Sequence, residues 1–166
     1  MANITLGGNP VRTIGNLPSA GSLLMDVELV DDELGRRKLS EFRGQKLVLN
    51  IFPSIGTGVC ATSVREFNQR AASMENTAVL CISRDLPFAQ KSFCAAEGIE
   101  NVHMLSDYAT HEFGIGLGVE MVDGKFYKLL ARSVVTVDVD GTILYTELVP
   151  EIAQEPNYEA ALGSLA

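Results

Sequence analysis

The clearest hydrophobic pattern in the chain is a strand–helix–strand unit in its first half. Residues 46–52 form a mostly apolar run that predicts a buried strand, and residues 77–83 predict a second one. Between them, residues 61–73 carry apolar side chains at helical spacing. A parallel pair of strands joined by a right-handed helical crossover is the most economical arrangement of such a unit.

Smaller elements lie on both sides of this unit. In chain order, we expect a hairpin (4–6 and 11–14), a strand (24–30), a charged turn (31–36), a helical turn (40–44), a helix (87–97) stopped by Gly98, a short strand (101–105), a helical segment (107–113), a second hairpin (132–138 and 142–147) around an Asp-Gly turn, and a closing helix (156–165). This order predicts an α/β, thioredoxin-like fold with an N-terminal β-hairpin extension.

Length and charge narrow the class of protein. At 166 residues, the chain is expected to form one domain, residues 1–166. Its net charge of −8 argues against a nucleic-acid partner and against docking on anionic membrane, because both need a basic face. The first residues lack the features of a secretory signal, and no apolar run approaches the ~20 residues of a membrane span. We therefore expect a cytoplasmic protein whose three cysteines are reduced, and either catalytic or incidental.

Cys60 is the first candidate for chemistry, because it stands where the strand at 46–52 gives way to the helix. The unpaired N–H groups of a first helical turn and the positive end of the helix dipole favour a thiolate over a thiol. The preceding Pro53, Thr57 and Gly58 form a loop whose backbone can come close to a ligand. The alternative is an ordinary buried cysteine, which is what most cysteines are.

Several short motifs around this cysteine resemble a known family. Pro53, Thr57 and Cys60 reproduce the Pro-x-x-x-Thr-x-x-Cys pattern of the peroxiredoxins. The longer strings that look like the thiol peroxidase subfamily are Asn50-Ile51-Phe52-Pro53-Ser54-Ile55, Thr57-Gly58-Val59-Cys60, Asp85-Leu86-Pro87-Phe88-Ala89-Gln90, Phe93-Cys94 and Ala131-Arg132. Gly56 departs from the subfamily, many members of which carry an acidic residue there. The resemblance covers nearly the whole chain and implies an atypical two-cysteine peroxiredoxin.

This resemblance implies roles for four residues around the reactive sulfur. Cys60 would be the peroxidatic thiolate, which attacks a peroxide oxygen and becomes a sulfenic acid. Thr57 would bind the peroxide through its hydroxyl, Pro53 would wall off the pocket, and Arg132 would place its guanidinium beside the sulfur. Interpreted from residue type and position alone, the last three are a turn hydroxyl, a strand terminator and a solvated arginine.

The resemblance also makes Cys94 the resolving residue, the second thiol, which would form an intrachain disulfide with Cys60. The two cysteines start on different predicted helices, and a disulfide needs Cα atoms within ~7 Å. We therefore expect local unwinding of the first helix's opening turn, and consider the same for the second helix, during turnover. Cys81 lies in the middle of a predicted strand and is interpreted as an inert core thiol.

The family implies thioredoxin as the reductant that reopens the disulfide, and a homodimer as the resting assembly. It implies no metal, haem or flavin, because sulfur supplies both electrons. His103 and His111 make no metal-ligand pattern with any cysteine. The glycine-rich run at 114–118 does not match a dinucleotide-binding fingerprint and predicts a closely packed loop, with a subunit interface as one setting for it.

The resulting hypothesis is a peroxidase that reduces hydrogen peroxide and organic (alkyl or lipid) hydroperoxides. Two alternatives stay open at this point. One is a general thiol–disulfide oxidoreductase, although the chain lacks the Cys-x-x-Cys pair typical of such enzymes. The other is a non-enzymatic peroxide sensor, in which a disulfide changes the surface offered to a partner protein.

Overall fold

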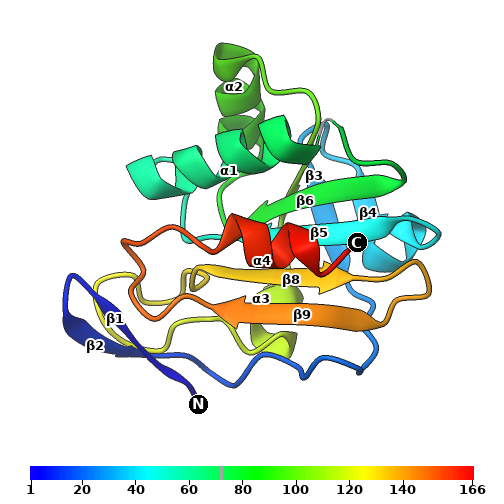
Figure 1. Ribbon diagram of the computed structural model, residues 1–166. Coiled ribbons are helices and arrows are strands. Elements are labelled where there is room, and N and C mark those ends of the chain that lie inside the picture. The colour runs from blue at the N-terminus through cyan, green and yellow to red at the C-terminus, as the bar shows by residue number, and fades with distance from the viewer. Residues whose placement is uncertain (72) are drawn as a thin grey trace.

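The computed structural model describes residues 1–71 and 73–166, which form a seven-stranded sheet with helices on both faces and a separate hairpin (Figure 1). The strands are β1 (Asn3–Leu6), β2 (Asn9–Arg12), β3 (Glu28–Asp31), β4 (Arg36–Lys38), β5 (Lys46–Ile51), β6 (Thr77–Ser83), β7 (His103–Ser106), β8 (Ser133–Val137) and β9 (Ile143–Leu148). The helices are the 3₁₀ helix η1 (Leu39–Phe42), α1 (Gly58–Ala71), α2 (Pro87–Glu97), α3 (Glu112–Gly116) and α4 (Tyr158–Gly163). In this described part of the chain, no helix has the length and apolarity needed to cross a bilayer.

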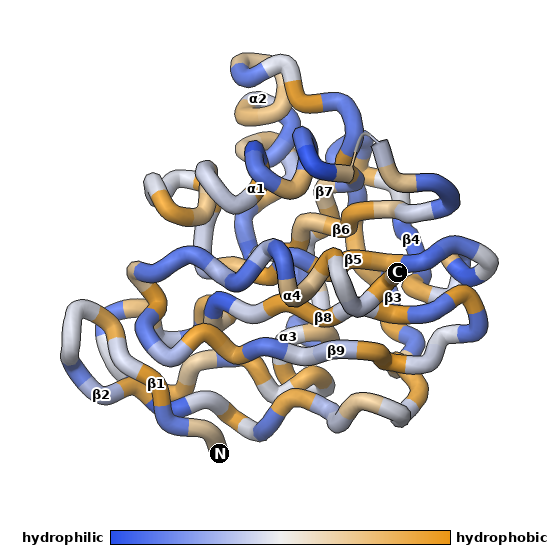
Figure 2. Tube along the Cα trace, viewed as in Figure 1, coloured by the Kyte–Doolittle hydropathy of each residue, from blue (hydrophilic) through white to orange (hydrophobic). Residues whose placement is uncertain are grey.

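The sheet has the order β4-β3-β7-β6-β5-β8-β9, and β1 and β2 pair only with each other. β5 runs parallel to β6 and β6 runs parallel to β7, whereas β8 lies antiparallel to β5 on its other side. β5 therefore has partners along both edges, and Figure 2 shows the hydrophobic colour concentrated along the central strands. The predicted parallel strand–helix–strand unit and the N-terminal hairpin are confirmed.

Both faces of the central strands are covered, which explains why their sequences are apolar without alternation. Leu49 belongs to the buried cluster that includes Phe113 of α3. The neighbouring Val48 points to the other face, where its cluster includes Val64 of α1 and Ala161 of α4. Figure 1 shows the same division, with α1 and α4 over one face of the sheet and α3 over the other.

The helix α1 begins earlier than its apolar pattern indicates. The pattern predicts a helix over residues 61–73, of which residue 72 lies outside the described residues. α1 starts instead at Gly58, because the carbonyl of Thr57 accepts a hydrogen bond from the amide four residues on, at 3.0 Å. Glycine and β-branched residues have modest helix propensity, so the pattern does not signal this turn. Cys60 therefore lies inside the first turn of the helix rather than ahead of it.

The helical segment predicted over residues 107–113 is mostly a turn. The carboxylate of Asp107 accepts a hydrogen bond from the amide of Gly114 at 3.0 Å, and its carbonyl accepts one from the amide of His111 at 2.9 Å. His111 adopts a left-handed conformation with φ of 62°, so α3 starts only after it. The prediction was wrong because the left-handed His111 interrupts the helix after one turn, and the Asp107 side chain takes over the amide of Gly114.

Two other elements are shorter than predicted. Only the second half of the strand expected over 24–30 pairs in the sheet, because the amide of Leu24 donates to the carbonyl of Gly141 in the β8–β9 turn at 2.8 Å. The closing helix expected over 156–165 starts late, because the side chain of Asn157 caps it by accepting a hydrogen bond from a backbone amide at 3.0 Å.

The glycine-rich run at 114–118 packs closely, as predicted, but its first three residues belong to α3 rather than to a loop. Gly118 has φ of +79°, and a Cβ atom there would lie 2.6 Å from the carbonyl oxygen of Asn16. A Cβ atom at Gly114 would lie 2.5 Å from the side chain of Leu130. Backbone and side chains approach too closely at both positions for any larger residue.

We expect Gly118→Ala to lower the free energy of unfolding by about 1–3 kcal/mol more than Gly8→Ala does, because of overpacking. Gly8 also has a positive φ, +83°, but nothing lies within 4 Å of its Cβ position. The matched variant therefore carries only the left-handed backbone cost of about 1–2 kcal/mol. Urea unfolding followed by circular dichroism measures both values. Equal losses would show that the contact with Asn16 does not constrain the loop.

Candidate active site

Cys60 lies at the carboxyl end of the central strand β5, in the first turn of α1. Its side chain is 0% exposed and belongs to the apolar cluster that includes Val64 and Phe67. The N–H groups of a first helical turn have no partner within the helix, and they carry the positive end of its dipole. The position therefore suits a sulfur that carries negative charge.

Arg132 lies against this sulfur. It directly precedes β8, and the antiparallel pairing of Ile51 with Ser133 brings it to the end of β5 where α1 begins. Its Nη2 donates to the Sγ of Cys60 at 3.3 Å, and its Nε donates to the carbonyl of Ile152 at 2.8 Å. The side chain is only 2% exposed, and its Nη1 has no hydrogen-bond partner among the described residues. One N–H group of a buried cation is therefore free for a ligand.

A second enclosed arginine, Arg84, has carboxylate partners. Arg84 makes ion pairs with Asp107 at 2.8 Å and with Glu120 at 2.9 Å, and both carboxylates are fully buried. Among the described residues, Arg132 has no carboxylate within ion-pair distance. Among the described residues, the sulfur of Cys60 is the only side-chain atom that accepts a hydrogen bond from the Arg132 guanidinium.

A pocket of about 140 Å³ opens beside Arg132. Its lining is mostly apolar and comes from five separated parts of the chain: Leu6, Thr57, Gly58, Val59, Phe126, Arg132, Ile152 and Ala153. Thr57 and Arg132 supply its polar side chains. The pocket can therefore hold a molecule with an apolar body and a polar end.

The other predicted residues of the loop take different positions. The Oγ1 of Thr57 donates to the carbonyl of Ser54 at 3.1 Å, so in this state it bonds backbone rather than the sulfur. Pro53 is buried, but it is not part of the pocket lining, so the structure does not give it the predicted position as a wall of the pocket. Asp85 holds the loop, because its carboxylate accepts hydrogen bonds from the Ser54 hydroxyl at 2.7 Å and the Ile55 amide at 2.8 Å.

Asp85 and several lining residues were missed by sequence reasoning. Asp85 belongs to a motif string, but nothing in the sequence indicates that it reaches across to the loop at 53–57. Leu6 and Phe126 line the pocket from the N-terminal hairpin and the segment before β8, and Ile152 supplies the carbonyl for Arg132. No sequence signal marks these positions, because only folding brings them together.

The three cysteines are free, and they have different surroundings. Cys81 is buried in β6, and burial raises the pKa of its thiol to about 12. Cys94 is half-buried on α2, where burial, followed by the charge of Asp32, raises the pKa of its thiol to about 11. Both are neutral thiols near neutral pH. Cys94 packs against the same apolar cluster as Cys60, with both helices intact.

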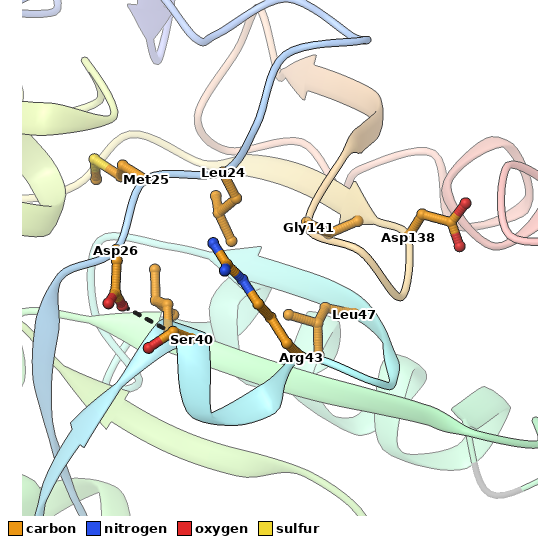
Figure 3. A pocket seen from close by; sticks show the side chains of 10 residues that line it. Leu24, Met25, Asp26, Ser40, Arg43, Leu47, Asp138 and Gly141 are labelled. Atoms are coloured by element: carbon orange, nitrogen blue, oxygen red, sulfur yellow. Dashed lines mark hydrogen bonds between the residues drawn. The ribbon is translucent and has the colours of Figure 1, made fainter.

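Other hollows in the described chain have different linings. One of about 330 Å³ lies beside Leu6 and Lys125, and one of about 250 Å³ lies beside Asp32 and Cys94; neither is lined by Arg132 or Thr57. The hollow in Figure 3 is lined by Leu24, Ser40, Arg43 and Gly141 among other residues, and its volume is about 10 Å³, the space of one water molecule. The hydrogen bond from the Ser40 amide to Asp26, 3.0 Å long and drawn there, closes one side of it. Within residues 1–71 and 73–166, no group of three or more His, Cys, Asp or Glu side chains can hold a metal ion.

Comparison with known proteins places this site in a family. The family model described as Redoxin matches residues 19–162. The chain is 54% identical over 165 residues to the thiol peroxidase of Mycobacterium tuberculosis, and 53% identical over 165 residues to that of Corynebacterium glutamicum, covering 99% of every chain. The crystal structure of a peroxiredoxin-like protein from Aquifex aeolicus superposes with a TM-score of 0.92 at 34% identity, covering 98% of this chain and 95% of that one.

The α/β architecture with its N-terminal hairpin is thus a thioredoxin-like redoxin fold. Within the redoxins, this chain belongs to the thiol peroxidases, a group of peroxiredoxin enzymes, and it has thiol peroxidase activity.

In a Cys60→Ser variant, we expect iodoacetamide to modify Cys94 slowly near neutral pH and faster as the pH rises toward about 11, because the thiolate is the nucleophile. Asp32→Asn should lower the pKa of Cys94 and speed the reaction at a given pH, whereas Asp140→Asn should not. Cys81 should stay unmodified until the protein unfolds. Mass spectrometry of tryptic peptides measures each site. Rapid labelling of Cys81 would contradict the assignment.

Proposed function

We propose that Cys60 is the peroxidatic residue of a thiol peroxidase that reduces hydrogen peroxide and organic hydroperoxides. Its thiolate attacks one peroxide oxygen, the O–O bond breaks, and the electron pair of that bond leaves with the other oxygen. The leaving oxygen takes up a proton and departs as water or an alcohol, and Cys60 becomes a sulfenic acid. The observation that carries this proposal is the buried Arg132 guanidinium, which meets sulfur instead of a carboxylate.

Arg132 stabilises negative charge at two stages of this reaction. Beside the sulfur, it stabilises the thiolate before attack. Its free Nη1 can donate a hydrogen bond to the peroxide, where negative charge grows on the departing oxygen. The Nε bond to the carbonyl of Ile152 fixes the plane of the guanidinium. A guanidinium suits this task because it presents several donors in a fixed geometry.

Thr57 and the apolar pocket select and orient the peroxide. The Thr57 hydroxyl already lines the pocket, and a rotation away from Ser54 lets it accept a hydrogen bond from a peroxide. Leu6, Phe126 and Ile152 supply apolar surface for the organic group of an alkyl or lipid hydroperoxide. Because Cys60 is fully buried, a shift of the turn before it is needed for the peroxide to reach the sulfur. Pro53 keeps a supporting role, as a residue that ends β5 and sets the loop.

Cys94 completes the cycle as the resolving residue. Its sulfur attacks the sulfenic acid, releases water and forms an intrachain disulfide with Cys60. The first turn of α1 and the end of α2 unwind to bring the two sulfurs together. A dithiol reductant of the thioredoxin type then takes over the disulfide and returns both thiols. We propose a cytoplasmic homodimer as the working form.

An NADPH-coupled assay with thioredoxin and thioredoxin reductase tests these roles. Cys60→Ser should abolish peroxide consumption, because among the described residues Cys60 is the only thiol beside Arg132. Cys94→Ser should allow one turnover and then stop, with a sulfenic acid on Cys60. Cys81→Ser serves as the control and should retain activity. Full turnover by Cys60→Ser would refute the assignment. Insulin reduction by the wild type without peroxide use would indicate a general oxidoreductase. Oxidation of the wild type without recycling would indicate a sensor.

Arg132→Lys should lower the second-order rate constant for peroxide by about 10²-fold, because lysine keeps the charge but loses the fork of donors. Stopped-flow competition against a peroxidase of known rate measures this constant. Arg84→Lys is unsuitable as a control, since it disrupts a buried ion network, so exposed Arg43→Lys is used instead. An unchanged rate in Arg132→Lys would remove Arg132 from the chemistry.

A further inference from the structure

A side chain of α1 reaches across to the end of α2. The guanidinium of Arg65 donates from Nη2 to the Oε1 of Glu97 at 2.7 Å and from Nε to the Oε2 at 3.3 Å. The same guanidinium lies over the ring of Phe93, 5.9 Å from its centroid. Two hydrogen bonds and an aromatic contact therefore join one arginine of α1 to the last turns of α2.

These two helices carry the two cysteines of the proposed cycle. Arg65 follows Cys60 on α1, and Phe93 and Glu97 flank Cys94 on α2. Arg65 therefore contacts α2 on both sides of Cys94, the residue that has to move in the proposed cycle.

The same end of α2 has a helix cap that can open. Gly98 ends the helix with φ of 64°, and the amides of Gly98 and Ile99 both donate to the carbonyl of Cys94. Loss of this cap frees the backbone of Cys94 without disturbing the strands. A further contact restrains the following loop, because the amide of Asn101 donates to the Oδ1 of Asn68 on α1 at 2.8 Å.

We propose that Arg65 and Glu97 are positioning residues that act as a latch, holding the last turn of α2 against α1 and thereby limiting the rate at which Cys94 reaches oxidised Cys60. This inference rests on the proposed function, since it presumes that Cys94 resolves the sulfenic acid. The latch sets how long the sulfenic acid survives. While it survives, a second peroxide molecule can oxidise it to a sulfinic acid, with release of water or an alcohol.

The chain contains a matched control for this contact. Arg70 pairs with Glu66 at 3.1 Å and lies over the ring of Tyr158, 5.0 Å from its centroid. The side chains are similarly exposed, 40% and 36% for this pair against 48% and 35% for Arg65 and Glu97. The control pair lies within α1 and stacks on α4, so its loss does not release α2.

The first experiment measures amide hydrogen exchange in the reduced protein without peroxide. Arg65→Ala should speed exchange over residues 94–99, whereas Arg70→Ala should not. The second experiment follows sulfenic acid and disulfide by rapid quenching and mass spectrometry. Arg65→Ala should form the Cys60–Cys94 disulfide about two- to five-fold faster, a range expected from the strength of exposed ion pairs. The rate of sulfenic acid formation should not change.

Two further readouts separate a latch from a general loss of stability. In Arg65→Ala, a higher peroxide concentration should be needed to convert half of Cys60 to sulfinic acid. A protein that is merely destabilised should not be protected from this oxidation. The charge-swapped double variant Arg65→Glu with Glu97→Arg should return both the amide hydrogen exchange over residues 94–99 and the rate of disulfide formation toward their wild-type values.

Disulfide formation in Arg65→Ala that is no faster than in Arg70→Ala would overturn the proposal. Unchanged exchange over residues 94–99 would overturn it as well. If the wild type forms no disulfide between Cys60 and Cys94, the resolving role of Cys94 has failed and the latch falls with it. The exchange measurement then still shows whether Arg65 holds α2, so the two failures can be told apart.

Discussion

The interaction on which the site depends is the contact between the guanidinium of Arg132 and the sulfur of Cys60. Burying a cation without a carboxylate costs several kcal/mol unless another group neutralises it. The fold pairs its other enclosed arginine, Arg84, with two buried carboxylates, and it gives Arg132 a sulfur and a carbonyl instead. The structure thus keeps a buried cation against the sulfur of Cys60, with one N–H group that has no hydrogen-bond partner among the described residues.

The central sheet makes this contact rigid. β5 and β8 are paired side by side and buried on both faces, so a slip of one residue would exchange the side chains of two differently packed cores. The register that pairs Ile51 with Ser133 therefore also fixes Arg132 opposite the start of α1. The helices that carry Cys60 and Cys94 are joined by exposed contacts, which break at much lower cost. In the proposed cycle, the sheet thus fixes the position of Arg132, whereas the helices that carry the two cysteines are free to move.

Environment, rather than sequence neighbourhood, distinguishes the three thiols. Cys60 alone has a guanidinium beside it and lies in a first helical turn. Burial raises the pKa of Cys81, and burial together with Asp32 raises that of Cys94, so both stay neutral near neutral pH. In the proposed cycle, a neutral second thiol does not compete for peroxide, which leaves Cys60 as the nucleophile of the first step.

The sequence by itself determined the strand–helix–strand unit and the place of Cys60 at its turn, because apolar periodicity is a local signal. It also carried the family motif, and with it the expectation that Arg132 lies near the sulfur. It did not predict the early start of α1 or the turn at 107–113, where single hydrogen bonds outweigh propensity. Only the tertiary structure decided what surrounds Arg132, because the contact joins residues 72 positions apart and depends on strand register and on a carbonyl from Ile152.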